Sequence, residues 1–201
     1  MIIFLYIVYL VTYIYTYAEI HAHFETIPSS LTLKQMAPIL LYNNFIITPV
    51  SGYLLAPYFS GLINLPDSRL IVIKELALSL LLSGLLFTVA HLLLHTKIGM
   101  KNIHYVHHQL KVVDGLGAFY AHPIEHLFGN LLPVYISLML FATNLVTYVL
   151  FIIIAISNTV VAHTEFENKI GGKHNIHHKV GSYNYGFMPY IIDRLIGTYR
   201  N

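Results

Sequence analysis

The sequence of 201 residues contains no cysteine, which excludes disulfide bonds, thiolate metal ligands and a cysteine nucleophile. Charged residues are also scarce, at 10% of the chain compared with about 25% in a typical globular domain. Hydrophobic residues make up 56%, and the mean hydropathy is +0.65. A net charge of +2, spread along the chain, gives no basic patch of the kind that binds nucleic acid. The composition therefore indicates a single membrane domain over residues 1–201 and excludes a disordered, collagenous or coiled-coil protein.

Long apolar runs predict an all-α integral membrane helical bundle of about four to five spans. Residues 1–18 contain no charge, and we expect a retained first span, because the basic start and small-residue cleavage site of a signal peptide are missing. Residues 70–94 form a clear span. Residues 37–65 are a weaker stretch with several prolines and glycines, and a single kinked span and a re-entrant pair both fit it.

Residues 131–161 form an apolar run that is too long for one span. As a single helix its 31 residues would measure about 47 Å, whereas the hydrocarbon core is about 30 Å thick. Asn144 lies near the middle and can mark a reversal, so we expect a hairpin of two helices. Eight of the 11 Lys and Arg residues lie in segments 95–130 and 163–201, which predicts that both segments face the cytoplasm.

Histidine is unusually frequent, with 13 copies against nine acidic residues. Most copies fall into motifs: HxxxH at 91–95, HxxHH at 104–108, HPIEH at 122–126, a lone His163, and HxxHH at 174–178. Spacings of three and four place imidazoles on one helical face. Imidazole binds zinc, copper, iron and nickel, and one ion takes three or four such ligands, so the pattern predicts two ions. The motifs can share a site only if the hairpin turns back.

At these residues the chain resembles the fatty acid hydroxylase/sterol desaturase superfamily of histidine-rich, integral-membrane diiron oxygenases. The order of the histidine motifs carries the resemblance, together with Asn184-Tyr185-Gly186 and the Asp193…Gly197-Thr198 segment. It covers about residues 85–200, the part of the chain that would be catalytic. It implies a bundle under a cytosolic, His-rich helical cap.

The resemblance implies ten metal ligands: His91, His95, His104, His107, His108, His122, His163, His174, His177 and His178. It offers supporting or possible roles to His126, Glu125, Asn184 and Asp193, and it assigns no catalytic residue beyond the ligands. His21 and His23 have no counterpart in the family, and we expect them in a solvated loop. The implied cofactors are two iron ions, with zinc able to replace them in a purified sample, O2, and an external electron donor such as cytochrome b5.

The implied activity is O2-dependent hydroxylation or desaturation of a C–H bond in a sterol-type or fatty-acyl lipid, within lipid biosynthesis. The lipid would come from the bilayer to a metal site on the cytoplasmic face, in the endoplasmic reticulum of a eukaryote or the inner membrane of a bacterium. The alternative is a non-catalytic or metal-transporting His-rich membrane protein. Transport predicts ionisable ligands inside the spans, whereas these histidines gather at span ends.

Overall fold

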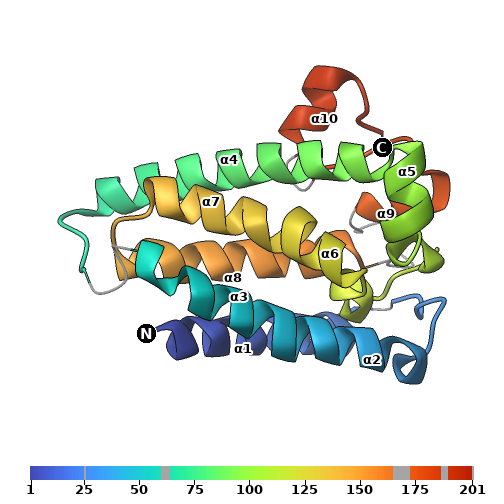
Figure 1. Ribbon diagram of the computed structural model, residues 1–201, viewed down its shortest axis with the longest axis horizontal. Coiled ribbons are helices and arrows are strands. Elements are labelled where there is room, and N and C mark those ends of the chain that lie inside the picture. Colours follow the sequence, from blue (N-terminus) through green and yellow to red (C-terminus); the bar gives the residue numbers. More distant parts are fainter. Residues whose placement is uncertain (25, 60–63, 165–172, 187–189, 201) are drawn as a thin grey trace.

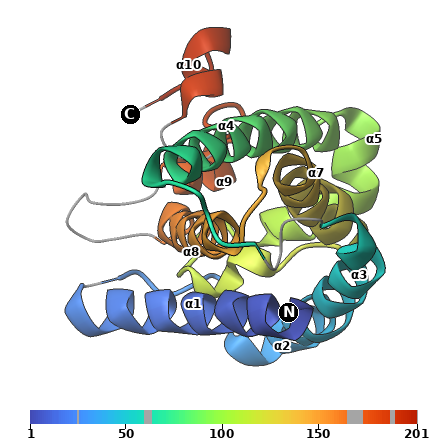
Figure 2. The ribbon, with the colours of Figure 1, turned by 90° about the vertical axis from the view of Figure 1, so that its left-hand side faces the viewer.

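The computed structural model describes residues 1–24, 26–59, 64–164, 173–186 and 190–200. Over these residues the chain is helical, and it includes five segments that are long and apolar enough to cross a membrane. These candidate spans are Ile2–His23, Leu33–Tyr58, Arg69–Leu94, Pro123–Phe141 and Leu145–Ala162. They lie lengthwise beside one another (Figures 1 and 2), which confirms the predicted all-α integral membrane bundle.

Ten α-helices are present in the described part of the chain. They are α1 (Ile2–His23), α2 (Leu33–Tyr42), α3 (Thr48–Leu55), α4 (Arg69–Leu94), α5 (Lys97–Gly99), α6 (Pro123–Glu125), α7 (Leu132–Phe141), α8 (Leu145–Ala162), α9 (His174–Val180) and α10 (Ile191–Ile196). Short π-helical turns occupy Asn43–Ile47, Met100–His104 and His126–Leu131, and 3₁₀ turns occupy Ala56–Tyr58, His107–Gln109 and Leu116–Phe119. The helices α5 and α9 lie at one end of the bundle, and α10 lies outside α4 (Figure 1).

The weaker apolar stretch crosses the bundle once, as the continuous helical segment Leu33–Tyr58. Its middle is distorted into a π-helical turn, and side chains supply the hydrogen bonds that a regular helix would make. The Asn44 amide donates to the carbonyl of Leu40 over 2.8 Å, and the Thr48 hydroxyl donates to the carbonyl of Asn43 over 3.0 Å. The re-entrant alternative is therefore not what the structure adopts.

The long apolar run turns back between α7 and α8, as predicted. Asn144 caps α8, and its side-chain oxygen accepts from the backbone N–H of Thr147 over 2.9 Å. The buried carboxylate of Glu75 in α4 holds the same reversal. It accepts from the Thr143 N–H at 3.2 Å, the Asn144 amide at 2.7 Å and the Thr147 hydroxyl at 2.8 Å. These bonds fix α4 to the hairpin at the end remote from the histidines.

Loop contacts show that the five crossings alternate. The loop after α1 meets the segment between the histidine motifs, where Ser30 N–H donates to the carbonyl of Val112 over 3.0 Å. At the opposite end, Leu145 N–H donates to the carbonyl of Asn64 over 3.0 Å. Both HxxHH motifs therefore lie at the same end of the bundle. That this end faces the cytoplasm stays a prediction from the Lys and Arg distribution.

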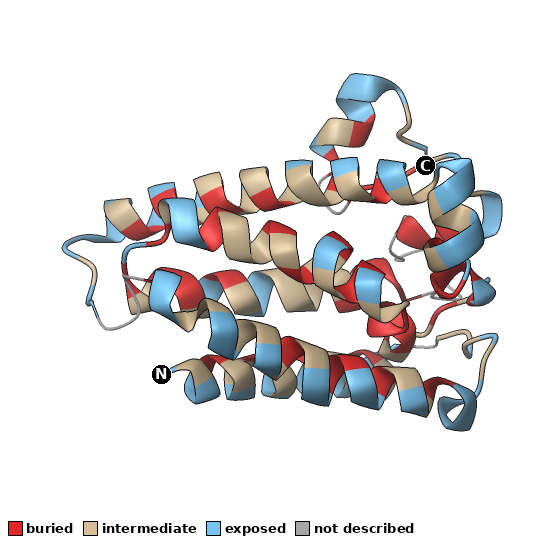
Figure 3. Cartoon of the chain, in the orientation of Figure 1, coloured by how far each residue is buried: buried red, intermediate tan, exposed pale blue. Residues whose placement is uncertain are grey.

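Buried residues line the inner faces of the helices and gather at the histidine end, while the outer faces are exposed (Figure 3). The helix α1 packs on α8, and α4 packs on α7. Aromatic side chains fill the interior between them: the ring centre of Phe119 lies 5.7 Å from that of Tyr9 and 5.0 Å from that of Tyr13. The exposed outer faces carry large apolar side chains such as Ile3 and Leu70, which fits a bilayer as the surrounding medium.

Candidate metal centre

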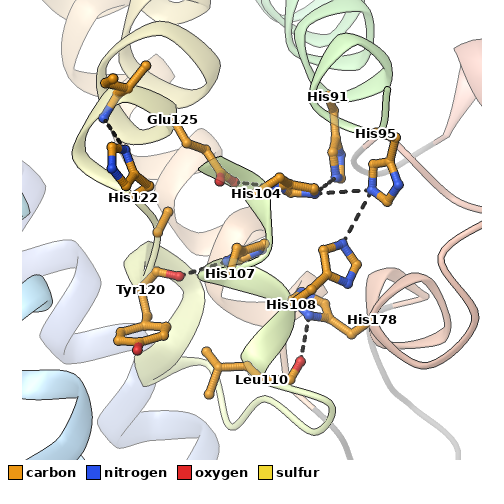
Figure 4. A network of polar contacts seen from close by, with 12 residues as sticks. His91, His95, His104, His107, His108, Leu110, Tyr120, His122, Glu125 and His178 are labelled. Atoms are coloured by element: carbon orange, nitrogen blue, oxygen red, sulfur yellow. Dashed lines mark hydrogen bonds and ion pairs between the residues drawn. The ribbon is translucent and has the colours of Figure 1, made fainter. Parts of the chain in front are cut away.

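Four segments bring nine histidines to one end of the bundle. The end of α4 supplies two, the turns after α5 supply three, the end of α8 supplies one, and α9 supplies three. In that order they are His91 and His95, then His104, His107 and His108, then His163, and finally His174, His177 and His178. Figure 4 shows several of these imidazoles turned toward one another.

The nine imidazoles form two groups. The first consists of His91, His95, His104, His108 and His177, and the second of His107, His163, His174 and His178. Within each group, one nitrogen of every member lies within 4.8 Å of the corresponding nitrogens of the others. The groups are adjacent, with the ring centres of His108 and His178 5.1 Å apart. His95 is partly exposed, and the other eight side chains are buried.

Seven of the nine imidazoles bond through Nδ1 to an oxygen that only accepts. The acceptors are the carbonyls of Tyr185, Tyr120, Thr159, Asn184, Tyr183 and Leu110, for His91, His107, His163, His174, His177 and His178 in that order, and the Glu125 carboxylate for His104. The Nδ1 atoms must therefore carry the protons. Each Nε2 atom keeps a lone pair, and this is the tautomer that binds metal through Nε2.

In the first group these lone pairs converge. The Nε2 atoms of His91 and His104 are 3.0 Å apart, and those of His177 and His108 are 3.2 Å apart. Two unprotonated nitrogens cannot form a hydrogen bond with each other, so a cation between the Nε2 atoms of His91 and His104 would stabilise this close approach. Metal–nitrogen bonds of about 2.0–2.1 Å in a tetrahedral site place neighbouring nitrogens about 3.3 Å apart. The observed spacing fits such a site.

In the second group the Nε2 atoms of His163, His174 and His178 are buried and have no hydrogen-bond partner within the described residues. A buried polar atom without a partner costs about 1–3 kcal/mol. A metal ion that accepts all three lone pairs would remove this cost. The donor sets of both groups therefore fit ions that prefer imidazole.

Burial keeps these histidines neutral, which is the state that ligates metal. It lowers the pKa of His107 to about 4, the pKa of His163 to about 3 and the pKa of His108 to about 3. It lowers the pKa of His95 to about 4, with a smaller contribution from the neighbouring His107. The four imidazoles are therefore uncharged at neutral pH before any metal binds.

The segment after α9 orients three ligand candidates from two helices. Three successive carbonyls accept from the Nδ1 atoms: Tyr183 from His177 at 2.8 Å, Asn184 from His174 at 3.0 Å, and Tyr185 from His91 at 2.7 Å. The residues Tyr183–Gly186 are called the orienting segment below. Sequence reasoning did not find this role, because backbone carbonyls leave no side-chain pattern.

Asn184 and Asp193 hold the orienting segment in place. Asn184 adopts a left-handed conformation with φ of 54°, and its amide donates to the carbonyl of Lys173 over 3.0 Å. The buried Asp193 carboxylate accepts from the N–H groups of Tyr185 at 2.7 Å and Gly186 at 2.8 Å. The side chains of both residues thus hold the orienting segment, and Asn184 contacts His174 only through its backbone carbonyl.

Glu125 contacts the first group, while the two histidines beside it do not join either group. The buried Oε1 of Glu125 accepts from His104 at 2.8 Å. His122 lies apart (Figure 4), because it is the residue before α6 and its Nδ1 accepts from the N–H of Ile124 at 3.2 Å. His126 is also outside both groups, and its Nε2 lies 2.9 Å from the hydroxyl of Thr48.

His21 and His23 lie in the last turn of α1, so the expectation of a loop is wrong for both. The hydrophobic run continues as a helix past the first charge. His23 is exposed, whereas the ring nitrogens of His21 lie 3.0 Å from the carbonyl of Asp114 and 2.9 Å from the hydroxyl of Thr26. His21 thus ties the first span to the loop between His108 and α6.

An apolar cavity of about 180 Å³ extends from the histidines into the bundle between the spans. Its polar end is lined by His91, His107, Glu125, His163 and His174, and its deeper walls include Phe59, Phe87, Leu138, Tyr148 and Phe151. The site therefore opens inward to a space that suits an apolar chain. Sequence reasoning did not locate the cavity, because its walls come from spans far apart in the chain.

Of the missed acceptors, one had a readable signal. Thr159 precedes His163 by four residues at the end of α8, so helical geometry alone places its carbonyl near that imidazole. Tyr120 and Leu110 lie in irregular segments, where no such periodicity applies.

Together, the five spans and the two adjacent histidine groups define a histidine-rich integral membrane protein with a two-part candidate metal site. The profile of the fatty acid hydroxylase family matches residues 76–198, and the chain belongs to this family. The matched range contains all nine histidines of the two groups.

Individual relatives agree with this assignment. Fatty acid hydroxylase domain-containing protein 2 of Homo sapiens is 32% identical over 127 residues, which are 62% of this chain and 38% of that protein. Fatty acid hydroxylase ahd1 of Mycosarcoma maydis is 26% identical over 168 residues, 79% of this chain and 44% of the relative. Methylsterol monooxygenase 2-1 of Arabidopsis thaliana is 31% identical over 137 residues, which are 65% of this chain and 48% of that protein. The chain thus covers less than half of these relatives. No solved structure matches it.

Proposed function

We propose that this chain is a membrane-bound non-heme diiron oxidoreductase that uses O2 to hydroxylate or desaturate a lipid C–H bond in lipid biosynthesis. The observation that carries the proposal is the junction of two all-histidine groups with an apolar cavity between membrane spans. The names of the relatives, which include a fatty acid hydroxylase and a methylsterol monooxygenase, support both the reaction type and a lipid substrate.

The nine histidines of the two groups would hold the two ions, and His122 is left out of this set because it lies outside both groups. When bound, iron supplies the O2 activation and C–H oxidation that no amino-acid side chain can perform. Zinc also accepts imidazole ligands, so a purified sample can carry zinc in place of iron.

The protein's own residues orient the imidazoles and prepare a dry site. The backbone carbonyls and Glu125 fix the proton of each bonded imidazole on Nδ1, so that Nε2 faces the centre. The cavity walls exclude water and hold an apolar chain, with its reactive carbon at the end lined by His91 and His163.

The substrate and the electron donor belong to the same proposal. A lipid would come from the bilayer, and electrons would come from an external protein such as cytochrome b5. Exposed lysines at the histidine end, namely Lys97, Lys101 and Lys111, favour an acidic partner and a cytoplasmic orientation. The membrane would be the endoplasmic reticulum in a eukaryote or the inner membrane in a bacterium.

The cavity favours this proposal over metal transport. A transported ion needs polar or charged ligands along its path through the spans. Below the histidine groups, however, the cavity is walled by apolar and aromatic side chains such as Leu138, Tyr148 and Phe151. This lining suits a hydrocarbon chain and offers little to a hydrated ion.

The test is a lipid analysis of cells that express the chain under isotopically labelled O2. The wild type is compared with a His107→Ala/His177→Ala variant, which removes one member of each group, and with His23→Ala, an exposed histidine outside both. Wild type and His23→Ala should yield a lipid that has gained labelled oxygen or lost two hydrogens, and the double variant should not. Identical lipid profiles in all three would contradict the proposed activity.

A further inference from the structure

The short helix α10 lies beside α4 on the outside of the bundle (Figures 1 and 2). Its outer face is apolar and exposed, with 46% of Ile191, 76% of Leu195 and 49% of Ile196 accessible. Three large apolar side chains on six residues form a face that water would disfavour. The question is what covers it.

The position of α10 along α4 is the first observation that bears on this cover. Gly186 lies between the two helices, because a Cβ atom built on it would be 2.8 Å from Asp193 Oδ2 and 3.0 Å from Thr88 Oγ1. Thr88 is six residues before the end of the α4 span, which is about 9 Å of helix. The helix α10 thus lies beside the last turns of the α4 span, near its histidine end.

The surface of α4 next to α10 is also apolar. The exposed residues of α4 at this depth are apolar and include Leu85, Val89 and Leu92. The guanidinium of Arg194, on α10, lies 3.7 Å from the ring centre of Tyr199. Arginine and tyrosine are side chains that reach the headgroup level from an apolar stem. An apolar face flanked by such a pair is typical of a helix at the boundary of acyl chains and headgroups.

The inner face of α10 reaches the candidate metal site through Asp193. The buried carboxylate accepts from the N–H groups of Tyr185 and Gly186 and from the hydroxyl of Thr198. The carbonyl of Tyr185 in turn accepts from Nδ1 of His91 at 2.7 Å. A continuous set of contacts therefore joins the outer face of α10 to an imidazole of the first group.

We propose that α10 is a lipid-seated clamp on the metal centre. The acyl-chain region of the leaflet holds its outer face, and Asp193 holds the orienting segment that positions His91. The coupling to metal rests on the proposed function, whereas the seat in the lipid does not. Removal of the lipid, or of the apolar face, loosens the orienting segment and weakens the retention of the ions.

The lipid seat is tested by fluorescence quenching. The chain contains no tryptophan, so Leu195→Trp introduces a single fluorophore. The full chain is placed in vesicles of phosphatidylcholine with brominated acyl chains. Its emission should be quenched as strongly as that of Leu85→Trp on the outer face of α4, while Lys111→Trp in an exposed loop stays bright. Quenching no stronger than that of Lys111→Trp overturns the lipid seat.

The clamp is tested by the rate at which a chelator removes the bound ions from the full chain in lipid nanodiscs. Leu195→Glu and Asp193→Asn should each lose the ions at least tenfold faster than the wild type, whereas Leu195→Phe should match it. Leu65→Glu, at an exposed position before α4 and remote from the histidines, is the matched charge control. Because Asp193→Asn leaves the outer face intact, it tests the link from α10 to the orienting segment even if Leu195→Glu does not fold.

The outcomes separate the two proposals. If the wild type retains ions and both Asp193→Asn and Leu195→Glu retain them equally long, the clamp is overturned and the metal centre stands. If the wild type holds no ions, the proposed function and the clamp fail together, and the quenching result still decides whether α10 sits in the lipid.

Discussion

His104 donates its Nδ1 proton to the Oε1 atom of Glu125 over 2.8 Å, and both side chains are buried. This is the contact among the seven orienting bonds in which the acceptor is a side chain rather than a backbone carbonyl. It is therefore the one that a substitution can remove without disturbing the backbone.

Glu125→Ala should weaken metal binding at the first group by about 10–100-fold, because the imidazole of His104 loses the acceptor that fixes its tautomer and direction. Glu125→Gln retains an acceptor oxygen, so its loss should be smaller. The measurement is competition with a chelator of known affinity. Glu19→Ala removes an exposed carboxylate of α1 and serves as the control. Equal affinities for all variants would rule out the orienting role of Glu125.

Acid should destabilise the metal-free protein. The pKa of His107 is lowered to about 4 and that of His163 to about 3, whereas an unfolded chain has histidine pKa values of about 6.5. Between these values the unfolded state binds protons that the folded state does not. Stability is therefore constant above about pH 6.5 and falls below it, by roughly 1.4 kcal/mol per pH unit for each such buried histidine.

The check is thermal unfolding in detergent after chelator treatment, from about pH 8 down to about pH 5. The midpoint should be flat in the upper part of this range and fall in the lower part. Bound metal should raise the midpoint and steepen its loss on acidification, since protons and metal compete for Nε2. A midpoint that rises as the pH falls would contradict the assignment of these histidines as neutral and buried.

A glycine near His163 should tolerate no side chain. Gly115 has φ of +85°, its N–H donates to the His163 carbonyl at 3.2 Å, and a Cβ there would lie 2.6 Å from the hydroxyl of Thr164. Gly181 has a similar φ of +77° but open space around a Cβ. Gly181→Ala should cost about 1–2 kcal/mol from backbone strain alone. Gly115→Ala should cost clearly more, and equal unfolding free energies would refute the close approach.

Filling the cavity should lower the rate of product formation and leave the metal content unchanged. Ala155 in α8 lines the cavity, whereas Ile153 in the same helix is exposed on the outer face. Ala155→Phe should lower product formation on the order of tenfold or more, because the chain can no longer place its reactive carbon. Ile153→Phe should leave it unchanged. Full activity of Ala155→Phe with normal metal content would show that the substrate does not use this cavity.

The spans and the histidine clusters are the part of this structure that sequence reasoning reached, because both depend on local patterns. Hydropathy found the first span and α4, and the length of the run through Asn144 required the hairpin that the structure has. Spacing of three and four predicted one shared direction for His104, His107 and His108, but the structure places His107 in the second group and the other two in the first. The HxxHH motifs then had to meet because of the topology that the hairpin imposes.

Contacts between segments that are far apart in the chain could not be predicted from such local patterns. His122 belongs to a motif by spacing, but the proline after it makes it a helix cap with its ring directed at the N–H of Ile124. From the sequence, Glu75 is expected to be a charged side chain near the end of a span. In the structure it is buried against the reversal between α7 and α8. The orienting carbonyls of Tyr183, Asn184 and Tyr185 carry no side-chain signal at all. In each case the role depends on which segments meet in space.

The most direct test of the account is the metal content per chain of the purified protein, measured by elemental mass spectrometry. His107→Ala/His177→Ala removes one imidazole from each group, and His23→Ala is the control outside them. We expect about two ions per chain in the wild type and in His23→Ala, since one ion takes three or four such ligands, with most of them lost in the double variant. One ion or none, unchanged in the double variant, would contradict a two-ion centre at these histidines.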